Sequence, residues 1–283
     1  MPVSLQTCTQ INDHDAFRYH LYDGATFIIR QAEAFTRLNQ LLHARIHSEF
    51  MDSDPEYAHY SHDRDKLVAR ADNLKNHVRQ SREIYDAFVE FLTQQGVNPD
   101  RTALDCVTLR VQLPQYIDTG QTLSPHRDTW GSNVMSQINW WAPVYPVSRD
   151  KTLLIYPGYW QKAVTNSSEG WDYKAFKNMS YEDKKQESNL LPIAGETLPL
   201  DEGLAIVPDL CDMYVFSGAQ LHASVPNTTD TIRYSLEART FDVEDECQGH
   251  GAPNIDGAPA RTAYSWFHRL SDRAKAKDLI TSS

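Results

Sequence analysis

The feature that most constrains the fold is a change in the spacing of apolar residues near residue 105. Before it, apolar residues recur at helical spacing, as at Phe35, Leu38, Leu42 and Ile46, which places side chains on one face of a helix. After it, apolar and polar residues alternate, which is typical of strands. This change predicts an α+β fold with helices packed on one side of a β-sandwich or barrel.

Two helices are predicted in the first hundred residues. One spans 31–50, and the other spans 82–95 with its apolar residues on one side. Gly96 follows as a left-handed C-cap, and Pro99 prevents the helix from resuming. The acidic, histidine-containing stretch 54–65 lacks the glycine and the spacing of a calcium loop, so a solvated loop is predicted there.

Strands are predicted through the middle of the chain. In 105–113, Val107, Leu109 and Val111 alternate with polar residues, which gives one apolar and one polar face. Further strands are predicted at 134–144, 152–156, 204–207, 213–216 and 232–241. The segment 261–280 is predicted to be helical and basic.

The chain has no internal repeat, low-complexity tract or flexible linker, which predicts a single domain over 1–283. Its parts are a helical N-terminal region (about 1–103), a β-core (about 104–243) with an insert at 157–199, and a C-terminal tail (244–283). The insert carries several aromatic residues. Such a segment is typical either of a lid or binding loop, or of a solvated surface helix with aromatic anchors.

Charge and composition exclude several classes of function. The net charge of −11 argues against binding to nucleic acid or to anionic membranes, although a few arginines in a pocket can still attract an anionic substrate. No apolar run approaches the ~20 residues of a membrane-spanning helix, and the N-terminus lacks the pattern of a signal peptide. The four cysteines form no C-x-x-C pair. A reduced, cytoplasmic protein is therefore expected.

The main chemical motif is the segment 124–128, SPHRD. In an extended strand, residues two apart point to the same face, so His126 and Asp128 are predicted to bind one metal ion. His222 is predicted to be the third ligand, from another strand. Two histidines and one carboxylate leave coordination positions open, which is the arrangement of non-haem Fe(II) oxygenases.

The surroundings of the motif strengthen this prediction. A turn-like segment at 116–122, containing Gly120, precedes it, and His222 follows a predicted strand and a turn. Arg233 lies on the next strand, with Ser235 on the same face. A guanidinium suits the free carboxylate of a dicarboxylate co-substrate such as 2-oxoglutarate. The alternative role for Arg233 is a surface salt bridge.

Two segments resemble a known family. The segment 216–227, FSGAQLHASVPN, is similar to the distal-histidine strand of phytanoyl-CoA-dioxygenase-type Fe(II)/2-oxoglutarate oxygenases, where H-x-S-x-P-N followed by an arginine is typical. The segment 152–158, TLLIYPG, resembles that family's T-L-x-x-x-P-G-S-H stretch, with Tyr159 and Trp160 in place of the final S-H. The resemblance covers 105–241, about half of the chain.

This resemblance implies a double-stranded β-helix (jelly-roll, cupin-like) core with the helical region packed on one side. It makes His126, Asp128 and His222 the catalytic iron ligands. Arg233 becomes the partner of the distal carboxylate of 2-oxoglutarate, and Ser224 a hydrogen-bond donor to it. The further candidates are Gln112 and Ser235 for the co-substrate, and Arg110, Gln137, Asn139 and Trp141 for the substrate.

The implied activity is that of a dioxygenase that uses Fe(II), 2-oxoglutarate and O2 and releases succinate and CO2. It would hydroxylate, desaturate or cyclise an unactivated C–H bond, and the carboxylate at Asp128 argues against halogenation. The expected substrate is a small polar molecule, either amino-acid-like or a specialised metabolite, with an acyl chain on a carrier as second choice. No nucleic-acid or membrane partner is expected.

Two alternatives from other classes stay open. One is a metal-binding cupin, either without catalysis or modifying sugars, but a cupin usually draws several histidines and a glutamate from two closely spaced motifs. The other is a ligand-binding protein that has kept the fold and lost turnover.

Overall fold

The computed structural model describes the chain except at residues 1–3, 32, 118–123, 181–182, 184–189 and 281–283. The predicted turn around Gly120 falls outside the described residues. No helix in the described part of the chain is long and apolar enough to cross a membrane.

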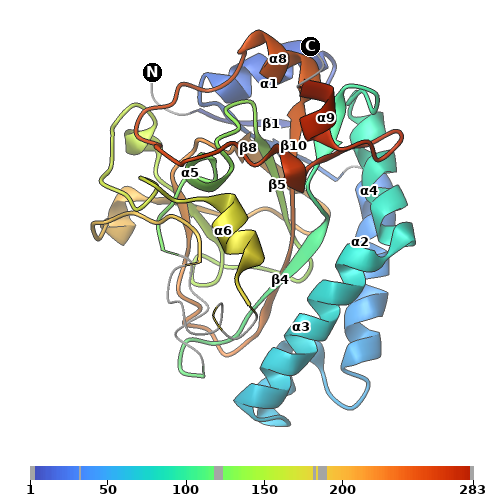
Figure 1. Ribbon diagram of the computed structural model, residues 1–283. Helices are drawn as coiled ribbons and strands as arrows, with labels where there is room; N and C mark the ends of the chain where they lie inside the picture. The colour runs from blue at the N-terminus through green and yellow to red at the C-terminus, as the bar shows by residue number, and fades with distance from the viewer. Residues whose placement is uncertain (1–3, 32, 118–123, 181–182, 184–189, 281–283) are drawn as a thin grey trace.

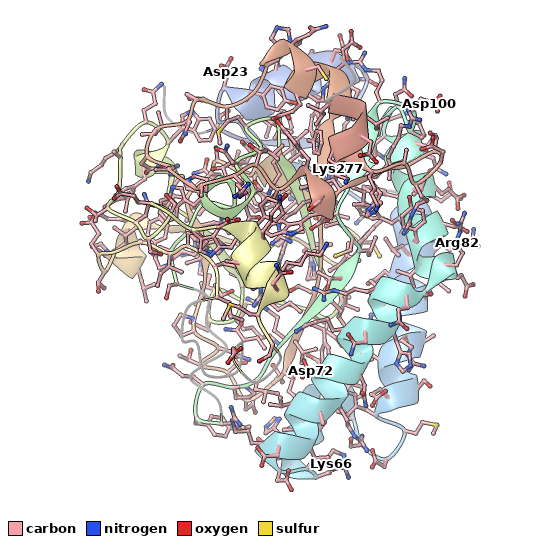
Figure 2. All side chains as sticks on the ribbon, in the orientation of Figure 1. Asp23, Lys66, Asp72, Arg82, Asp100 and Lys277 are labelled. Carbon is pink, nitrogen blue, oxygen red and sulfur yellow. The ribbon has the colours of Figure 1, made fainter. Side chains whose placement is uncertain are left out.

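The longest helices lie in the first hundred residues, where three of them pack side by side along one flank of the molecule (Figure 1). These three are α2 (Glu33–Glu49), α3 (Arg64–Gln80) and α4 (Arg82–Gln94). Figure 2 shows charged side chains such as Lys66 and Arg82 on their outer surface. The other α-helices are short: α1 (His14–Tyr22), α5 (Thr129–Ser132), α6 (Tyr173–Asn178), α8 (Val243–Gln248) and α9 (Ala276–Ile280).

Both predicted helices are confirmed. In α2, the predicted stripe is fully buried. Helix α4 begins at its N-cap Ser81, whose hydroxyl accepts a hydrogen bond from Ile84 N at 3.3 Å. It ends before Gly96, whose φ of +80° is the left-handed conformation expected after a helix.

Two local predictions are wrong. The stretch 54–65, predicted as a solvated loop, is not a loop throughout, because Pro55–Tyr60 forms a 3-10 helix and Asp63 caps α3 through a hydrogen bond from Lys66 N at 2.8 Å. The segment 261–280 is not one helix. It contains a 3-10 turn (Tyr264–Trp266), a two-residue strand, and only the short helix α9.

The strands form two sheets. The large one follows the order β1-β2-β8-β5-β10-β3-β11, with β4 also paired to β10, and the small one follows β7-β6-β9. All pairs are antiparallel except β1 with β2. The bounds are β1 (Leu5–Cys8), β2 (Thr26–Ile29), β3 (Thr102–Leu104), β4 (Thr108–Gln112), β5 (Ile138–Pro143), β6 (Leu153–Ile155), β7 (Leu204–Ile206), β8 (Met213–Ser217), β9 (His222–Ser224), β10 (Arg233–Asp242) and β11 (His268–Arg269).

This mixed architecture confirms the α+β prediction, and each strand predicted after residue 104 is present with shorter or nearly equal bounds. The N-terminal region is not only helical, however, since β1 and β2 extend the large sheet at one edge. Strand β11, from the C-terminal tail, joins its other edge. The large sheet is therefore built from all three parts of the chain.

Strand β10 shows how the large sheet divides the molecule. Tyr234 and Leu236 are fully buried in the core shared with α2, α3 and α4. On that side, the rings of Phe91 in α4 and Trp140 in β5 meet edge to face with centroids 6.0 Å apart. The alternate residues of β10 face the small sheet, because side chains alternate along a strand. That second face carries the site.

Candidate metal centre

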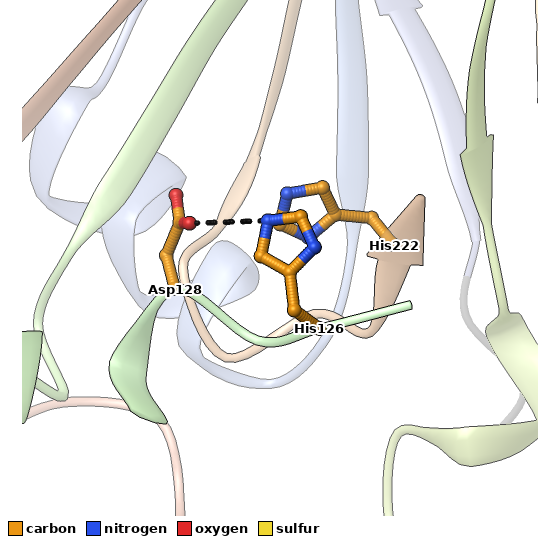
Figure 3. A group of neighbouring side chains, drawn as sticks. All are labelled: His126, Asp128 and His222. Atoms are coloured by element: carbon orange, nitrogen blue, oxygen red, sulfur yellow. Dashed lines mark ion pairs between the residues drawn. The ribbon is translucent and has the colours of Figure 1, made fainter. Parts of the chain in front are cut away.

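Three predicted ligands converge in space. His126, Asp128 and His222 each offer a ligand atom, and these atoms lie within 4.8 Å of one another. Figure 3 shows the two imidazoles and the carboxylate around one small space, with His126 Nε2 3.5 Å from Asp128 Oδ1. The centroids of the two imidazole rings are 4.2 Å apart. This donor set of two nitrogens and one oxygen is that of a facial triad.

Backbone pairing brings two of these residues together. His126 and His222 form an antiparallel bridge, with His126 N donating to His222 O at 2.9 Å and His222 N donating to His126 O at 3.0 Å. The sequence predicted that His126 and Asp128 lie on one face of an extended strand, and the structure contradicts this. The φ of −62° and ψ of −29° of Asp128 are helical, and this residue stands at the N-terminal end of α5. A turn, and not an extended strand, therefore brings its carboxylate back to the imidazoles.

Each imidazole is held through its Nδ1 atom. His126 Nδ1 lies 2.8 Å from Ser124 O, and His222 Nδ1 lies 2.9 Å from Gln220 O. A carbonyl only accepts, so Nδ1 carries the proton and Nε2 keeps a lone pair for a metal. Burial, followed by the neighbouring His126, lowers the pKa of His222 to about 3, which keeps it neutral as a ligand must be.

Asp128 is held on its other oxygen. Its Oδ2 accepts hydrogen bonds from Arg239 Nε at 2.8 Å, Asn139 Nδ2 at 2.7 Å and Gln137 Nε2 at 3.4 Å. Burial opposes ionisation of this carboxyl, but Arg239 and the histidines hold its pKa well below the usual range. Asp128 is therefore anionic, with Oδ1 left toward the metal position.

The predicted anchor, Arg233, is buried next to the predicted donor, Ser224. Its guanidinium donates to Ser224 Oγ at 3.3 Å and to Thr152 O at 3.0 Å. Burial, followed by Arg110, lowers its pKa to about 9. Arg233 faces Gln112 across the sheet, with Ser235 two residues along. It is thus no surface salt bridge, because it is 2% exposed.

Several buried polar atoms around Arg233 have no partner in the described part of the chain. They are Arg233 Nε, Ser235 Oγ and Gln112 Oε1. Buried polar atoms are normally paired, and an unpaired one costs about 1–3 kcal/mol. Three such atoms around one guanidinium fit a site that takes a polar, anionic ligand such as the distal carboxylate of 2-oxoglutarate.

The predicted substrate residues take different places. Gln137 and Asn139 hold Asp128, as described above. Arg110 donates to Glu237 at 2.7 Å, so its charge is already balanced. Trp141 is buried and lines a cavity of about 30 Å³ between the triad and the large sheet, together with Ser224 and Glu237.

A larger cavity of about 500 Å³ opens beside His126 and Asp128. One wall is apolar and is formed by Phe176 in α6, Leu191, Pro192 and Trp266. The insert 157–199 thus contributes to this wall through its described residues, whichever of its two predicted roles it serves. Arg79, Cys106 and Gln137 line other parts of the cavity.

Sequence reasoning missed three charged residues near the triad, of which Arg127 is buried and Glu237 and Arg239 are half-buried. Glu237 and Arg239 continue the face of β10 that begins with Arg233, so the alternating pattern R-x-S-x-E-x-R carried their signal. Arg127 is 3% exposed. It donates to Ala219 O at 2.6 Å and Tyr159 O at 2.7 Å, and it pairs with Asp256 at 3.2 Å. Only tertiary structure shows those partners.

No protein-family model and no curated protein matches the chain. Among solved structures, EvdO2 from Micromonospora carbonacea var. aurantiaca, complexed with 2-oxoglutarate, is 12% identical over 59% of this chain and 62% of its own, with a TM-score of 0.41. The chain thus spans about three fifths of the length of EvdO2.

Two further solved structures are similar at the same level. ThoJ, a non-heme monooxygenase, is 11% identical over 87% of this chain and 90% of its own, with a TM-score of 0.39. SnoK, a non-heme alpha-ketoglutarate-dependent carbocyclase from nogalamycin biosynthesis, is 14% identical over 65% of this chain and 66% of its own, with a TM-score of 0.35. Likenesses this weak do not establish a shared function.

Proposed function

We propose that this protein is an iron(II)- and 2-oxoglutarate-dependent dioxygenase that oxidises an unactivated C–H bond of a small molecule. The observation that carries the proposal is the convergence of His126, Asp128 and His222, with ligand atoms within 4.8 Å and both imidazoles fixed through Nδ1. Bound there, iron(II) with 2-oxoglutarate and O2 would supply C–H oxidation with release of succinate and CO2.

Arg233 and Ser224 support the assignment of the co-substrate. A guanidinium presents parallel N–H groups to a carboxylate, and Arg233 is buried with its Nε unpartnered among the described residues. Because Arg110 balances Glu237, Arg233 is left as the net positive charge at that end of the site. In this assignment Gln112 and Ser235 lie beside the same carboxylate.

We assign the core to the double-stranded β-helix (jelly-roll) type and the chain to the phytanoyl-CoA-dioxygenase-type branch, as one domain over 1–283. Two facing sheets support the first assignment. Through its bridge to His222 in β9, the segment at His126 extends the edge of the small sheet β9-β6-β7. This sheet faces strands β4, β10, β5 and β8 of the large sheet. The motifs at 152–158 and 216–227 support the second.

The decisive experiment measures succinate. Protein purified without oxygen is incubated with Fe(II) and 2-oxoglutarate, O2 is admitted, and succinate is quantified with and without a broad substrate panel. Iron-dependent succinate is expected, and His126→Ala should lose both iron and succinate. If the parent protein forms no iron-dependent succinate with any member of the panel, the proposal fails.

A second experiment tests the anchor. Arg233→Ala should weaken 2-oxoglutarate binding by at least about tenfold, the effect of losing a charge-assisted hydrogen bond, while iron is retained. The matched control is Arg149→Ala, which removes an exposed arginine that lines none of the cavities described above. Calorimetric titration measures both. Binding by Arg233→Ala as tight as that of the parent would remove Arg233 from the proposed site.

A further inference from the structure

The cavity beside the triad does not end at its apolar wall. A second cavity of about 250 Å³ adjoins it, and Arg79, Asp105 and Cys106 line both. The second cavity is built where α3 meets α4, against β3 and β11. Figure 2 labels Arg82 at this junction. The two cavities are thus neighbours that share these three residues.

The second cavity is lined by cations. Arg79, Arg82 and Arg273 border it together with His268, and Asp105 is the one carboxylate among its described lining residues. Asp105 is already occupied, since it accepts hydrogen bonds from Arg239 N at 3.0 Å and Arg239 Nη1 at 3.3 Å. Burial also raises its pKa. It therefore offers little negative charge to the cavity.

Two of the arginines have no ion-pair partner among the described residues. Arg79 donates through Nε to the hydroxyl of Thr108 at 3.2 Å, and the guanidinium of Arg273 lies 4.3 Å from the ring centroid of Tyr85. Arg82, in contrast, pairs with Asp86 at 2.8 Å. A guanidinium without a carboxylate keeps its donors available for an anion.

The local field is positive although the whole chain is acidic. Burial lowers the pKa of His268, and the charges of Arg273, Lys275 and Lys177 lower it further. Ser81 and Arg82, at the amino end of α4, also line this cavity. A concentration of cations in a protein of net charge −11 favours an anionic ligand at this place.

We propose that the substrate is amphiphilic, with an anionic group, a carboxylate or a phosphate, that binds Arg79 and Arg273. Its apolar body lies against Phe176, Leu191 and Trp266 and extends toward the triad. The identification of this ligand as the substrate rests on the proposed function. The anion site itself does not, because none of the metal ligands lines the second cavity.

The test uses metal-free protein and three probes that share one alkyl chain: hexanoate, hexyl phosphate and hexanol. Calorimetric titration should show saturable binding of at least one anionic probe, about tenfold or more tighter than that of hexanol, as expected for a charge-assisted contact. The stronger of the two anionic probes identifies the head group. Equal affinity for hexanol, or no saturable binding of either anion, overturns the inference.

Variants locate the site. Arg79→Gln and Arg273→Gln should each weaken binding of the anionic probe about tenfold or more and leave hexanol binding unchanged. Arg149→Gln is the matched control, and both test positions are exposed, so folding is expected to persist. Unchanged melting temperatures check that point. If both variants bind the anion as the parent does, the inference is wrong.

The two proposals fail separately. Anion binding without iron-dependent succinate would contradict the oxygenase assignment and keep the anion site. Succinate formation without a preference for anions would contradict only the anion site.

Discussion

At the scale of single residues, Asp128 shows how one carboxylate is divided between two tasks. Its Oδ1 faces His126 and the metal position, and its Oδ2 accepts hydrogen bonds from Arg239 and Asn139. The guanidinium fixes the orientation of the carboxylate and offsets the effect of burial on its pKa. Arg239 is therefore a positioning residue that acts through Asp128.

Arg239→Gln tests that role. Metal affinity should fall about 10–100-fold, as for other changes of residues that orient a ligand. The ratio of the metal affinity of the parent to that of the variant should increase as the pH falls. Without Arg239 the pKa of Asp128 rises, so a proton competes with the metal for Asp128 at a higher pH than in the parent. Zinc titrations at two pH values measure both effects.

The control for this change is Arg269→Gln, which breaks a surface pair with Asp272 at 2.6 Å. It should bind zinc as the parent does. A parent-to-variant ratio that is the same at both pH values would show that Arg239 does not act through the charge of Asp128.

At the scale of elements, the candidate metal centre depends on segments that are far apart in the chain. Arg127 lies between the two ligands of the SPHRD segment and ties it to the loop before β9, to the insert, and to Asp256 near the C-terminus. Asp256 also accepts hydrogen bonds from Trp130 Nε1 at 2.6 Å and Val164 N at 3.0 Å. These contacts hold the turn that places Asp128.

Arg127→Met should lower the free energy of unfolding by about 3–5 kcal/mol, because it leaves the buried Asp256 carboxylate without its cation. The double variant with Asp256→Asn should recover part of this loss, since the uncompensated charge is gone. Urea denaturation measures the free energy of unfolding of the parent, of each single variant (Arg127→Met and Asp256→Asn) and of the double variant. If the effects of the two single changes simply add, the pair is not coupled as described.

At the scale of the whole molecule, the large sheet separates two environments. On one side it packs against α2, α3 and α4 in an aromatic and aliphatic core, and on the other it presents charged side chains to the candidate metal centre. A half-buried titratable group also occurs outside the site. His14 in α1 accepts a hydrogen bond from Arg18 at 3.0 Å, and burial, followed by Arg18, lowers its pKa to about 4.

The stability of the metal-free protein should therefore depend on pH. Between pH 6.5 and about 4 the unfolded state binds a proton at His14 that the folded state does not, so stability falls as the pH falls through this range. One such proton changes the free energy of unfolding by about 1.4 kcal/mol per pH unit. In urea denaturation with a chelator present, the His14→Gln variant should lose this contribution to the dependence of the free energy of unfolding on pH. The exposed His20→Gln should keep it, and equal slopes for parent and His14→Gln would contradict the assignment.

Much of this molecule is readable from its sequence because the signals are local. Periodicity identified α2, α4 and the main strands. The motif residues led to three side chains that converge within 4.8 Å, and to Arg233, which is buried. The failures are also local in cause. The 261–280 segment has helical composition, but tertiary contacts pull residues 268–269 into the sheet. Strands β1 and β2 are too short to show a clear period.

The sequence by itself determined the α+β class and the residue types for a metal centre, because periodicity and ligand chemistry are properties of neighbouring residues. Only the tertiary structure decided how they meet. It placed Asp128 in a turn, assigned Gln137 and Asn139 to Asp128, paired Arg110 with Glu237, and opened a cation-lined cavity beside the site. Those results depend on contacts between residues distant in the chain, which no local pattern encodes.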